Sequence, residues 1–164
     1  MKSKSVCFTG HRSQKLPWGF NEDDERCLAM KATLKSEIEK AIQNGYDTFY
    51  CGMALGFDII CAETLIELRE KYDIFIIGAI PCKNQERKWP KDCKERYQNL
   101  LAQLNSVRCK YDAYNGAACM HERNRYMVDN SSLLIALFNG EEGGTKYTVD
   151  YARNKGLQVV IIEP

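Results

Sequence analysis

Short apolar runs alternate along the chain with longer segments in which apolar residues recur at every third or fourth position. The runs are typical of strands buried on both faces of a sheet, and the longer segments are typical of amphipathic helices. Regular alternation of strand and helix predicts an α/β fold in which a mostly parallel sheet carries helices on both faces.

The predicted strands cover residues 4–9, 47–51, 73–80, 106–110, 133–138 and 157–162. Helices are predicted from the capping residues at 21–24 to Asn44, and over residues 58–68, 86–104, 119–130 and 146–154. Pro81 is expected to stop the third strand, and Pro90 to delay or kink the third helix. No repeat, low-complexity tract or linker interrupts the pattern, so residues 1–164 are expected to form one domain.

Composition narrows the function classes. A net charge of +1 gives no general attraction to nucleic acid or to an anionic membrane. The eight cysteines form no Cys-x-x-Cys pair, and only two histidines are present, so we interpret the cysteines as reduced core residues and expect no metal. No apolar run is long enough for a membrane span or an export signal, and we therefore expect a cytoplasmic protein.

Glycines follow several of the predicted strands. Gly10 precedes His11 and Arg12, Gly52 and Met53 open a turn that reaches Gly56, and Gly143 and Gly144 precede Thr145. The carboxyl ends of parallel strands meet at one edge of the sheet, where open α/β folds bind ligands. A glycine turn that leads into a helix lets backbone N–H groups approach a phosphate. We therefore predict a phosphate-binding site, with ordinary tight turns as the alternative.

Several side chains at these positions have two interpretations. Arg12 is suited to binding a phosphate or carboxylate, or to a surface ion pair. His11 would contact a ligand, act as an acid or base, or serve as a structural hydrogen-bonding residue. Asp58 would cap the following helix or accept a hydrogen bond from a ribose hydroxyl. The aromatic residues Trp18, Tyr111 and Tyr114 are expected to be exposed. They would line the pocket, form part of a protein interface, or do neither.

The segment His121-Glu122-Arg123-Asn124-Arg125 is predicted near the start of a helix on the ligand side of the sheet. Glu122 with Tyr126, and Arg125 with Asp129, are neighbours at helical spacing, which a solvated face would explain. Arg123 and Asn124 lack such partners and are the better candidates for the pocket. The sequence lacks the phosphate-loop motif of kinases and NTPases, Gly-x-x-x-x-Gly-Lys-Ser/Thr. It also lacks the dinucleotide-binding motif Gly-x-Gly-x-x-Gly after the first strand.

Several motifs taken together resemble the YpsA-like branch of the SLOG superfamily, over essentially the whole chain: Gly10-His11-Arg12, residues 52–58, residues 123–129, and Gly143-Gly144-Thr145 with Tyr151-Ala152. That superfamily includes the Smf/DprA DNA-processing proteins and the LOG phosphoribohydrolases. The resemblance implies a Rossmann-like three-layer sandwich that binds nucleotides or derivatives of NAD or ADP-ribose, and an association with bacterial cell division or stress.

The sequence departs from the LOG enzymes at their catalytic motif. LOG enzymes carry Pro-Gly-Gly-x-Gly-Thr-x-x-Glu, whereas Thr148 occupies the place of the glutamate here, and Glu141 and Glu142 precede the glycines. A positioned carboxylate is central to glycosidic cleavage. We therefore favour a nucleotide-binding sensor or regulator over a hydrolase, for which His11, Asp58 or Glu122 would supply the catalytic group.

Single-stranded DNA binding ranks last because the sequence contains no basic stripe. The predicted ligand-binding residues are Gly10, His11, Arg12, Gly52, Met53, Gly56, Asp58, Arg123, Asn124, Gly143, Gly144 and Thr145. The sequence leaves open the ligand's identity, a protein partner and a homo-oligomer.

Overall fold

The structure is a computed structural model that describes residues 4–164. Its strands are β1 (Ser5–Gly10), β2 (Thr48–Cys51), β3 (Phe75–Cys82), β4 (Ser106–Tyr111), β5 (Leu133–Leu137) and β6 (Gln158–Ile162). Its helices are the short η1 (Ser13–Lys15) and then α1 (Glu25–Gln43), α2 (Phe57–Arg69), α3 (Lys91–Gln103), α4 (Ala117–Asp129) and α5 (Gly144–Asn154).

All the strands pair in parallel, in the order β4-β3-β2-β1-β5-β6. The chain starts at a central strand, moves outward through β2, β3 and β4, and then returns to place β5 on the other side of β1. The order therefore reverses between β1 and β5, the place where open parallel sheets form a ligand crevice. The predicted Rossmann-like α/β fold is confirmed.

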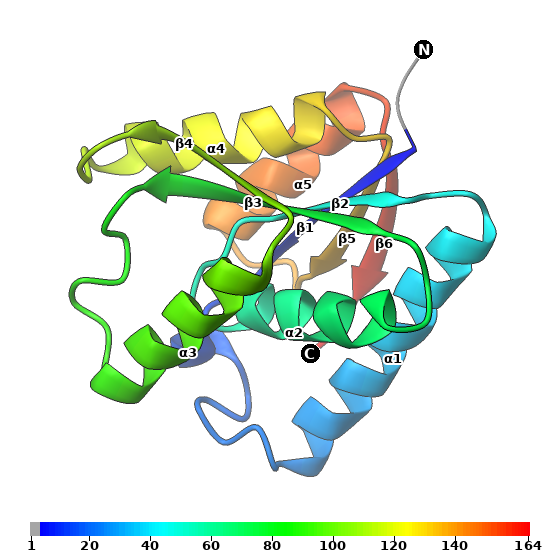
Figure 1. The fold of residues 1–164 in the computed structure, drawn as a ribbon, viewed down its shortest axis with the longest axis horizontal. Coiled ribbons are helices and arrows are strands. Elements are labelled where there is room, and N and C mark those ends of the chain that lie inside the picture. Colours follow the sequence, from blue (N-terminus) through cyan, green and yellow to red (C-terminus); the bar gives the residue numbers. More distant parts are fainter. Residues whose placement is uncertain (1–3) are drawn as a thin grey trace.

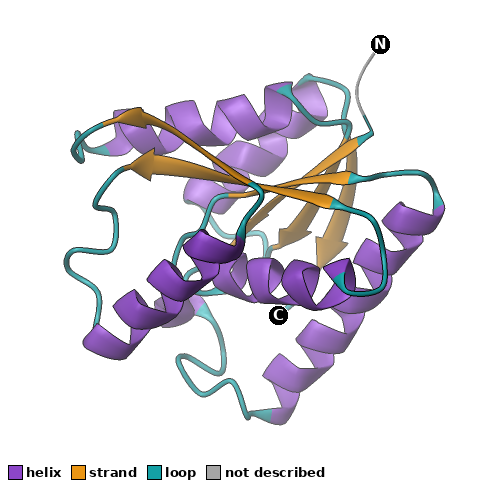
Figure 2. Ribbon diagram, viewed as in Figure 1, coloured by secondary structure: helices purple, strands orange, loops and turns teal. Residues whose placement is uncertain are grey.

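The two faces of the sheet are covered by different helices (Figures 1 and 2). Leu34 of α1, Leu65 of α2 and Leu100 of α3 belong to one buried cluster, and Met127 of α4 and Val149 of α5 belong to the other. Neighbouring residues of β1 alternate between the clusters, as the two-residue period of a strand requires. Three layers result.

Two proline positions show how the observed boundaries differ from the predicted ones. β3 continues through Pro81 to Cys82, so the prediction that Pro81 stops this strand was wrong. β3 pairs with β2 only as far as Gly78, and beyond that residue it pairs with β4 alone. Because Pro81 has a neighbour on one side only, its missing N–H removes little of the pairing. Pro90 is the N-cap of α3, and the helix therefore starts late, as one of the two predicted outcomes.

Within residues 4–164, no helix combines the length and the apolar character that crossing a bilayer would need.

Candidate functional site

A pocket of about 540 Å³ lies at the carboxyl ends of β1 and β5, where the strand order reverses. This volume lies in the range of small-molecule sites. Among the sequence-predicted residues, the pocket brings together Gly10, His11, Arg12, Asp58, Arg123, Asn124, Gly143, Gly144 and Thr145. Its other lining residues are Phe8, Thr9, Gln14, Lys15, Ala54, Tyr114, Ala117, Met120 and His121.

The start of α5 forms one wall of the pocket. Gly143 is the N-cap residue and has a φ of 144°, which glycine adopts readily, and it provides no side chain to cap the helix. The first backbone N–H groups of α5 therefore lack a side-chain acceptor in the described part of the chain. These groups and the helix dipole favour an anion at this wall. Helix α1, away from the pocket, instead has a side-chain cap from Asp24.

Arg123 places a buried positive charge beneath the pocket. Its side chain comes from α4 and is only 3% exposed. Nη1 donates to the backbone carbonyls of Gly52 and Ala79, and Nε donates to Asn124 Oδ1 at 2.7 Å. Burial lowers the pKa of Arg123, while the charge of Asp58 opposes that effect. The guanidinium is held in one orientation by groups that only partly neutralise its charge.

Asp58 brings an unsatisfied acceptor to the same pocket. Its Oδ2 accepts a hydrogen bond from the backbone N–H of Ala54 at 3.1 Å, whereas Oδ1 is buried and has no hydrogen-bond partner within residues 4–164. Burial raises the pKa of Asp58, and the charge of Arg123 opposes the rise. The carboxylate therefore fixes the turn before α2, and Gly56 is the N-cap of that helix. The remaining oxygen is shielded from solvent and lacks a donor, so a hydroxyl or N–H group that reached it would satisfy it.

Arg12 and Lys15 line the pocket from the segment after β1. Both side chains are exposed, and within residues 4–164 neither makes an ion pair or a side-chain hydrogen bond. A Cβ added to Gly143 would lie 3.4 Å from Lys15 Nζ, which shows how close this ammonium group comes to the start of α5. The surface-ion-pair alternative for Arg12 therefore has no acidic partner in the described chain.

His11 joins the ends of the two strands that border the pocket. Its Nε2 lies 2.9 Å from Asn139 Oδ1, and that same oxygen accepts from the backbone N–H of Glu141 at 2.9 Å. The backbone N–H of Asn139 also donates to His11 Nε2, at 3.3 Å, so the tautomer of His11 decides whether Nε2 accepts this bond or donates to Oδ1. His11 is 4% exposed and lines the pocket, so it combines a structural bond with a position beside the ligand space.

Gly52, Met53 and Gly56 lie behind the pocket lining rather than in it. A Cβ at Gly52 would come within 2.7 Å of Arg123 Nη1 and 2.8 Å of Asp58 Oδ2. A Cβ at Gly56 would come within 2.7 Å of the backbone nitrogen of Ser13. Met53 is fully buried and has a φ of 62°. This turn therefore makes room for the buried charged groups and for the β1 loop.

Glu122 lies outside the pocket. Its carboxylate forms two hydrogen bonds with Arg108 of β4, and these bonds outweigh burial and lower the pKa of Glu122. Arg125 donates to Tyr147 Oη at 3.0 Å and therefore binds α5 rather than its helical neighbour. Asp129 likewise accepts from Tyr151 Oη at 2.8 Å. The predicted solvated face is thus in large part an α4–α5 interface.

Three predicted exposed aromatic residues have different environments. Trp18 is 5% exposed and belongs to the core, so the expectation that it is exposed was wrong. Tyr111 ends β4 and is partly buried. Tyr114 is 54% exposed and lines the pocket.

Sequence reasoning missed Gln14, Lys15, Met120 and His121 as pocket residues. Met120 and His121 precede Asn124 by four and three positions, so they share its helix face once the helix is extended to Ala117. The sequence signal for Lys15 is weaker: it is a second positively charged residue shortly after Arg12 in the same predicted loop.

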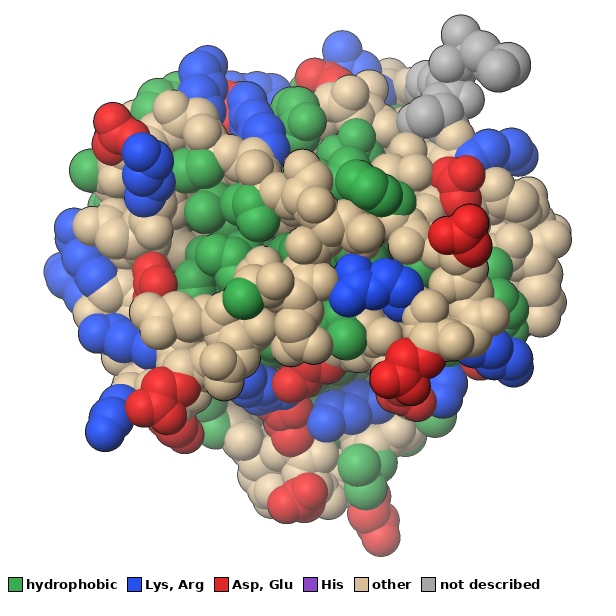
Figure 3. Space-filling model, in the orientation of Figure 1, with side chains coloured by type: hydrophobic (Ala, Val, Ile, Leu, Met, Phe, Trp, Pro, Cys, Tyr) green, Lys and Arg blue, Asp and Glu red, His purple; other side chains and the backbone are tan. Residues whose placement is uncertain are grey.

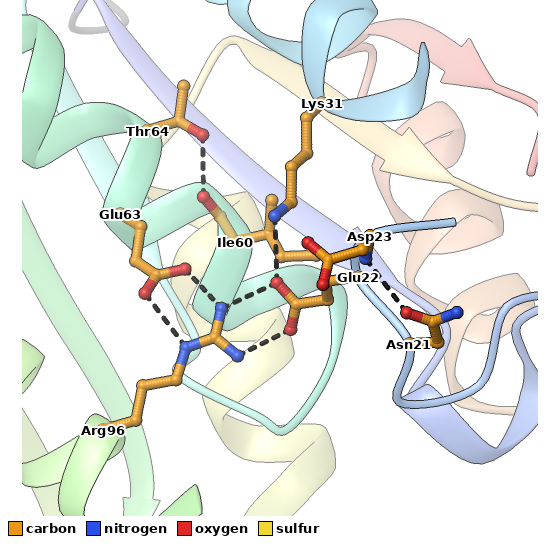
Figure 4. A network of polar contacts seen from close by, with 8 residues as sticks. All are labelled: Asn21, Glu22, Asp23, Lys31, Ile60, Glu63, Thr64 and Arg96. Carbon is orange, nitrogen blue, oxygen red and sulfur yellow. Dashed lines mark hydrogen bonds and ion pairs between the residues drawn. The ribbon is translucent and has the colours of Figure 1, made fainter. Parts of the chain in front are cut away.

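An ion-pair cluster, which we call the Arg96 clasp, fixes the segment that carries Arg12 and Lys15 (Figure 4). Arg96 of α3 binds the carboxylates of Glu63 in α2 and of Glu22, which lies just before α1. Lys31 of α1 also reaches Glu22, at 3.0 Å. Burial raises the pKa of Glu22, but the bonds from Arg96 and Lys31 outweigh it and leave that pKa below its ordinary value. The clasp therefore ties the end of the 11–24 segment to three helices.

Residues 4–164 contain no cluster of three His, Cys, Asp or Glu side chains suited to a metal ion. All eight cysteines are free thiols.

Solved structures of DprA proteins share the fold. The chain superposes with a TM-score of 0.63 on DprA from Helicobacter pylori, a structure described as showing a single-stranded DNA binding mode, at 17% identity. The TM-score to DprA from Streptococcus pneumoniae is 0.62 at 13% identity. Each alignment covers 96% of this chain, but only 64% and 50% of the respective DprA chains.

Sequence comparisons identify nearer relatives. A UPF0398 protein from Bacillus pumilus is 29% identical over 154 residues, which are 92% of this chain and 82% of the relative. The UPF0398 protein YpsA from Bacillus subtilis strain 168 is 26% identical, over 94% of this chain and 87% of that protein. The model of the YpsA family, described as the "YspA SLOG family", matches residues 6–161. The chain therefore belongs to the YpsA family of SLOG proteins.

Proposed function

We propose that this protein binds a nucleotide-derived ligand of the ADP-ribose or NAD type in the pocket between β1 and β5, and acts as a sensor or regulator. The observation that carries the proposal is that the uncapped N-terminus of α5 and two cations, Arg12 and Lys15, line one pocket, and neither cation has an acidic partner within residues 4–164. A role in cell division or stress rests on family membership alone.

The ligand's phosphate would lie against the backbone N–H groups at Gly143 and Gly144, with Arg12 and Lys15 neutralising its outer oxygens. Arg123 would add a fixed positive charge beneath it. The buried Asp58 Oδ1 would accept from a ribose hydroxyl, which would satisfy the oxygen that lacks a partner in the described chain. Phosphate and ribose hydroxyl are the two chemical groups that this donor and acceptor set matches.

Isothermal titration calorimetry with ADP-ribose, NAD and AMP tests the proposal. We expect binding by at least one of these ligands and a loss of about tenfold or more in the Arg12→Ala/Lys15→Ala variant, because two charge-assisted contacts disappear. Arg153→Ala removes an exposed cation near the other end of α5 and should retain the affinity. Absence of heat and of thermal stabilisation with every ligand at millimolar concentration would refute the proposal.

A hydrolase acting on an N-glycosidic or phosphoester bond is the second candidate, because Asp58 places a buried carboxyl group in the pocket. Thr148 occupies the position of the catalytic glutamate of LOG enzymes, and it is buried, with its hydroxyl donating to the carbonyl of Gly144 at 3.0 Å. This favours binding over cleavage. Chromatography of long incubations would detect released base or phosphate. Turnover that Asp58→Asn abolishes while ligand binding remains would support the enzyme.

The third candidate is single-stranded DNA binding, the property that the description of the H. pylori DprA structure gives for that protein. Figure 3 shows basic and acidic side chains interspersed on the face that it draws. Combined with a net charge of +1, this surface favours small-ligand binding over extended phosphate contacts. A thymidine oligomer that bound with a steep salt dependence would reverse this ranking.

A further inference from the structure

A second hollow of about 370 Å³ lies next to the main pocket, beside the loop between β3 and α3. The two spaces share Arg12, Tyr114 and Met120 as lining residues. The remaining lining of this space, which we call the second lobe, is Asn84, Gln85, Arg87, Lys88 and Trp89. The loop that provides them lies between the end of β3 and the start of α3 in Figure 1. The two spaces are therefore adjacent, and we call them together the groove.

The second lobe combines cations with aromatic rings. Its lining includes Arg87 and Lys88 and contains no carboxylate. Within residues 4–164, neither cation forms an ion pair. The neighbouring Glu86 is not part of the lining, and its Oε2 accepts from Gln98 at 3.3 Å. Phosphate oxygens are suitable partners for the cations, and a planar base for the rings of Trp89 and Tyr114.

Contacts with the main fold hold the loop in place. Gln85 Nε2 donates to the backbone carbonyl of Met53 at 3.3 Å and to Tyr97 Oη at 3.2 Å. Trp89 packs edge-on against Tyr97, with ring centroids 5.1 Å apart. Tyr97 itself is almost fully buried. The lobe is thus a built part of the groove, anchored both to the turn after β2 and to α3.

We infer that the groove takes a ligand with two nucleosides joined by a phosphate chain, and this inference rests on the proposed function. One nucleotide occupies the main pocket, the chain passes Arg12, and the second base lies against Tyr114 and Trp89. Arg87 and Lys88 bind the added phosphates. Because these cations would repel the positively charged nicotinamide ring of NAD, the second lobe favours an uncharged purine.

Three adenine ligands separate the contributions: ADP, adenosine tetraphosphate, and diadenosine tetraphosphate, measured by calorimetry. We expect affinity to rise about tenfold at each step, first through added phosphate contacts and then through base stacking. The second step is diagnostic, because diadenosine tetraphosphate carries less negative charge than adenosine tetraphosphate, and nonspecific attraction would reverse the order. The first step should disappear in Arg87→Ala/Lys88→Ala, and the second in Tyr114→Ala.

Lys91→Ala, which removes a nearby cation with a 91% exposed side chain that lines neither space, should retain both steps. Tyr114 is 54% exposed, so its variant is expected to fold, and circular dichroism checks this. Equal affinity for the two tetraphosphates, or steps that persist in the variants, would overturn the inference while ADP binding still supported the proposed function. Failure of all three ligands together with ADP-ribose, NAD and AMP would instead refute the proposed function. Tighter, steeply salt-dependent binding of a thymidine oligomer that needs Arg87 would also overturn the inference, in favour of a nucleic acid strand.

Discussion

Asp58 is costly for the fold and, in the proposed function, would contribute to binding. One oxygen fixes the turn at Ala54, while the other lies buried with no hydrogen-bond partner in residues 4–164. An unsatisfied buried acceptor costs about 1–3 kcal/mol of folding free energy. A ligand that donates to this oxygen recovers part of that cost, and Arg123 beside it keeps the carboxylate from being an isolated charge.

We predict that Asp58 makes ligand affinity depend on pH. Burial raises the pKa of Asp58 above its ordinary value of 3.8, so as pH falls through the raised pKa the carboxylate gains a proton and loses acceptor capacity. Affinity should fall with it. The Asp58→Asn variant should bind about tenfold more weakly at neutral pH, with little further change on acidification. Calorimetry from pH 7 downward measures this, and a parallel pH profile of the two proteins would contradict it.

The same shift has the opposite consequence for stability. Because the pKa of the folded state lies above that of the unfolded state, folding takes up a proton, and the contribution of Asp58 to stability decreases as pH rises through this range. The free energy of unfolding, measured by urea titration with and without the Asp58→Asn substitution, gives the sign directly.

Gly56 provides a second prediction at the residue scale. Its φ of 103° disfavours a side chain, and an added Cβ would lie 2.7 Å from the Ser13 nitrogen and 2.9 Å from the His11 oxygen. Gly56→Ala should therefore lower the free energy of unfolding by roughly 2–4 kcal/mol, since strain and a backbone clash combine. The matched control is Gly45→Ala, at a φ of 93° with open space around it, which should cost about 1–2 kcal/mol. Equal losses in the two variants would mean that the clash is absent.

At the scale of elements, the cations proposed to bind the ligand lie on a loop whose far end the helices hold in place. The 11–24 segment carries Arg12 and Lys15 into the pocket, and the Arg96 clasp binds its far end to α1, α2 and α3. Long charged side chains in the segment would otherwise lose more conformational entropy on binding a ligand.

Arg96→Ala should lower the free energy of unfolding by about 1–2 kcal/mol, a modest value because the arginine side chain is 35% exposed. Lys40→Ala, which removes an exposed pair with Glu37, should change it by less than about 0.5 kcal/mol. Because the pKa of Glu22 is lowered in the folded state, Glu22 stabilises the fold fully at pH values above its ordinary pKa of 4.5. This contribution is lost as the pH falls through the lowered pKa. Denaturant titrations at neutral and acidic pH should show the gap between wild type and Arg96→Ala closing in acid. A gap that persists there would exclude Glu22 as its source.

At the scale of the whole molecule, the reactivity of the cysteines depends on how well the core is packed. Burial raises the pKa of Cys7 to about 12 and raises those of Cys51 and Cys61 well above 9.0. Cys93 and Cys109 are the two that are not fully buried.

Because the thiolate is the reactive form, a thiol reagent at pH 8 should modify Cys93 and Cys109 first and reach the other six only as the protein unfolds. Mass spectrometry after timed labelling identifies the sites, and a denatured sample serves as the control. Early labelling of Cys7 or Cys61 would contradict the packing described above.

Periodicity and turn chemistry in the sequence determined the elements. Apolar runs between glycines predict the buried strands, and capping residues with helical spacing predict α1, because these signals depend on local backbone geometry and on burial of one face. Parallel strands also place Gly10–Arg12 and Gly143–Thr145 at one edge, since all their carboxyl ends point the same way. For these reasons the sequence predicted half of the pocket lining.

Only the tertiary structure decided which side chains face one another. Arg108 binds Glu122 across an edge strand and a helix, Trp18 enters the core, and Arg87 and Lys88 meet Tyr114 to form the second lobe. No local pattern encodes these contacts, because each depends on strand order and helix placement between segments distant in sequence. Arg12, Arg123 and the glycines of the proposed site were therefore visible in the sequence, whereas Lys15 and the shape and extent of the groove required the fold.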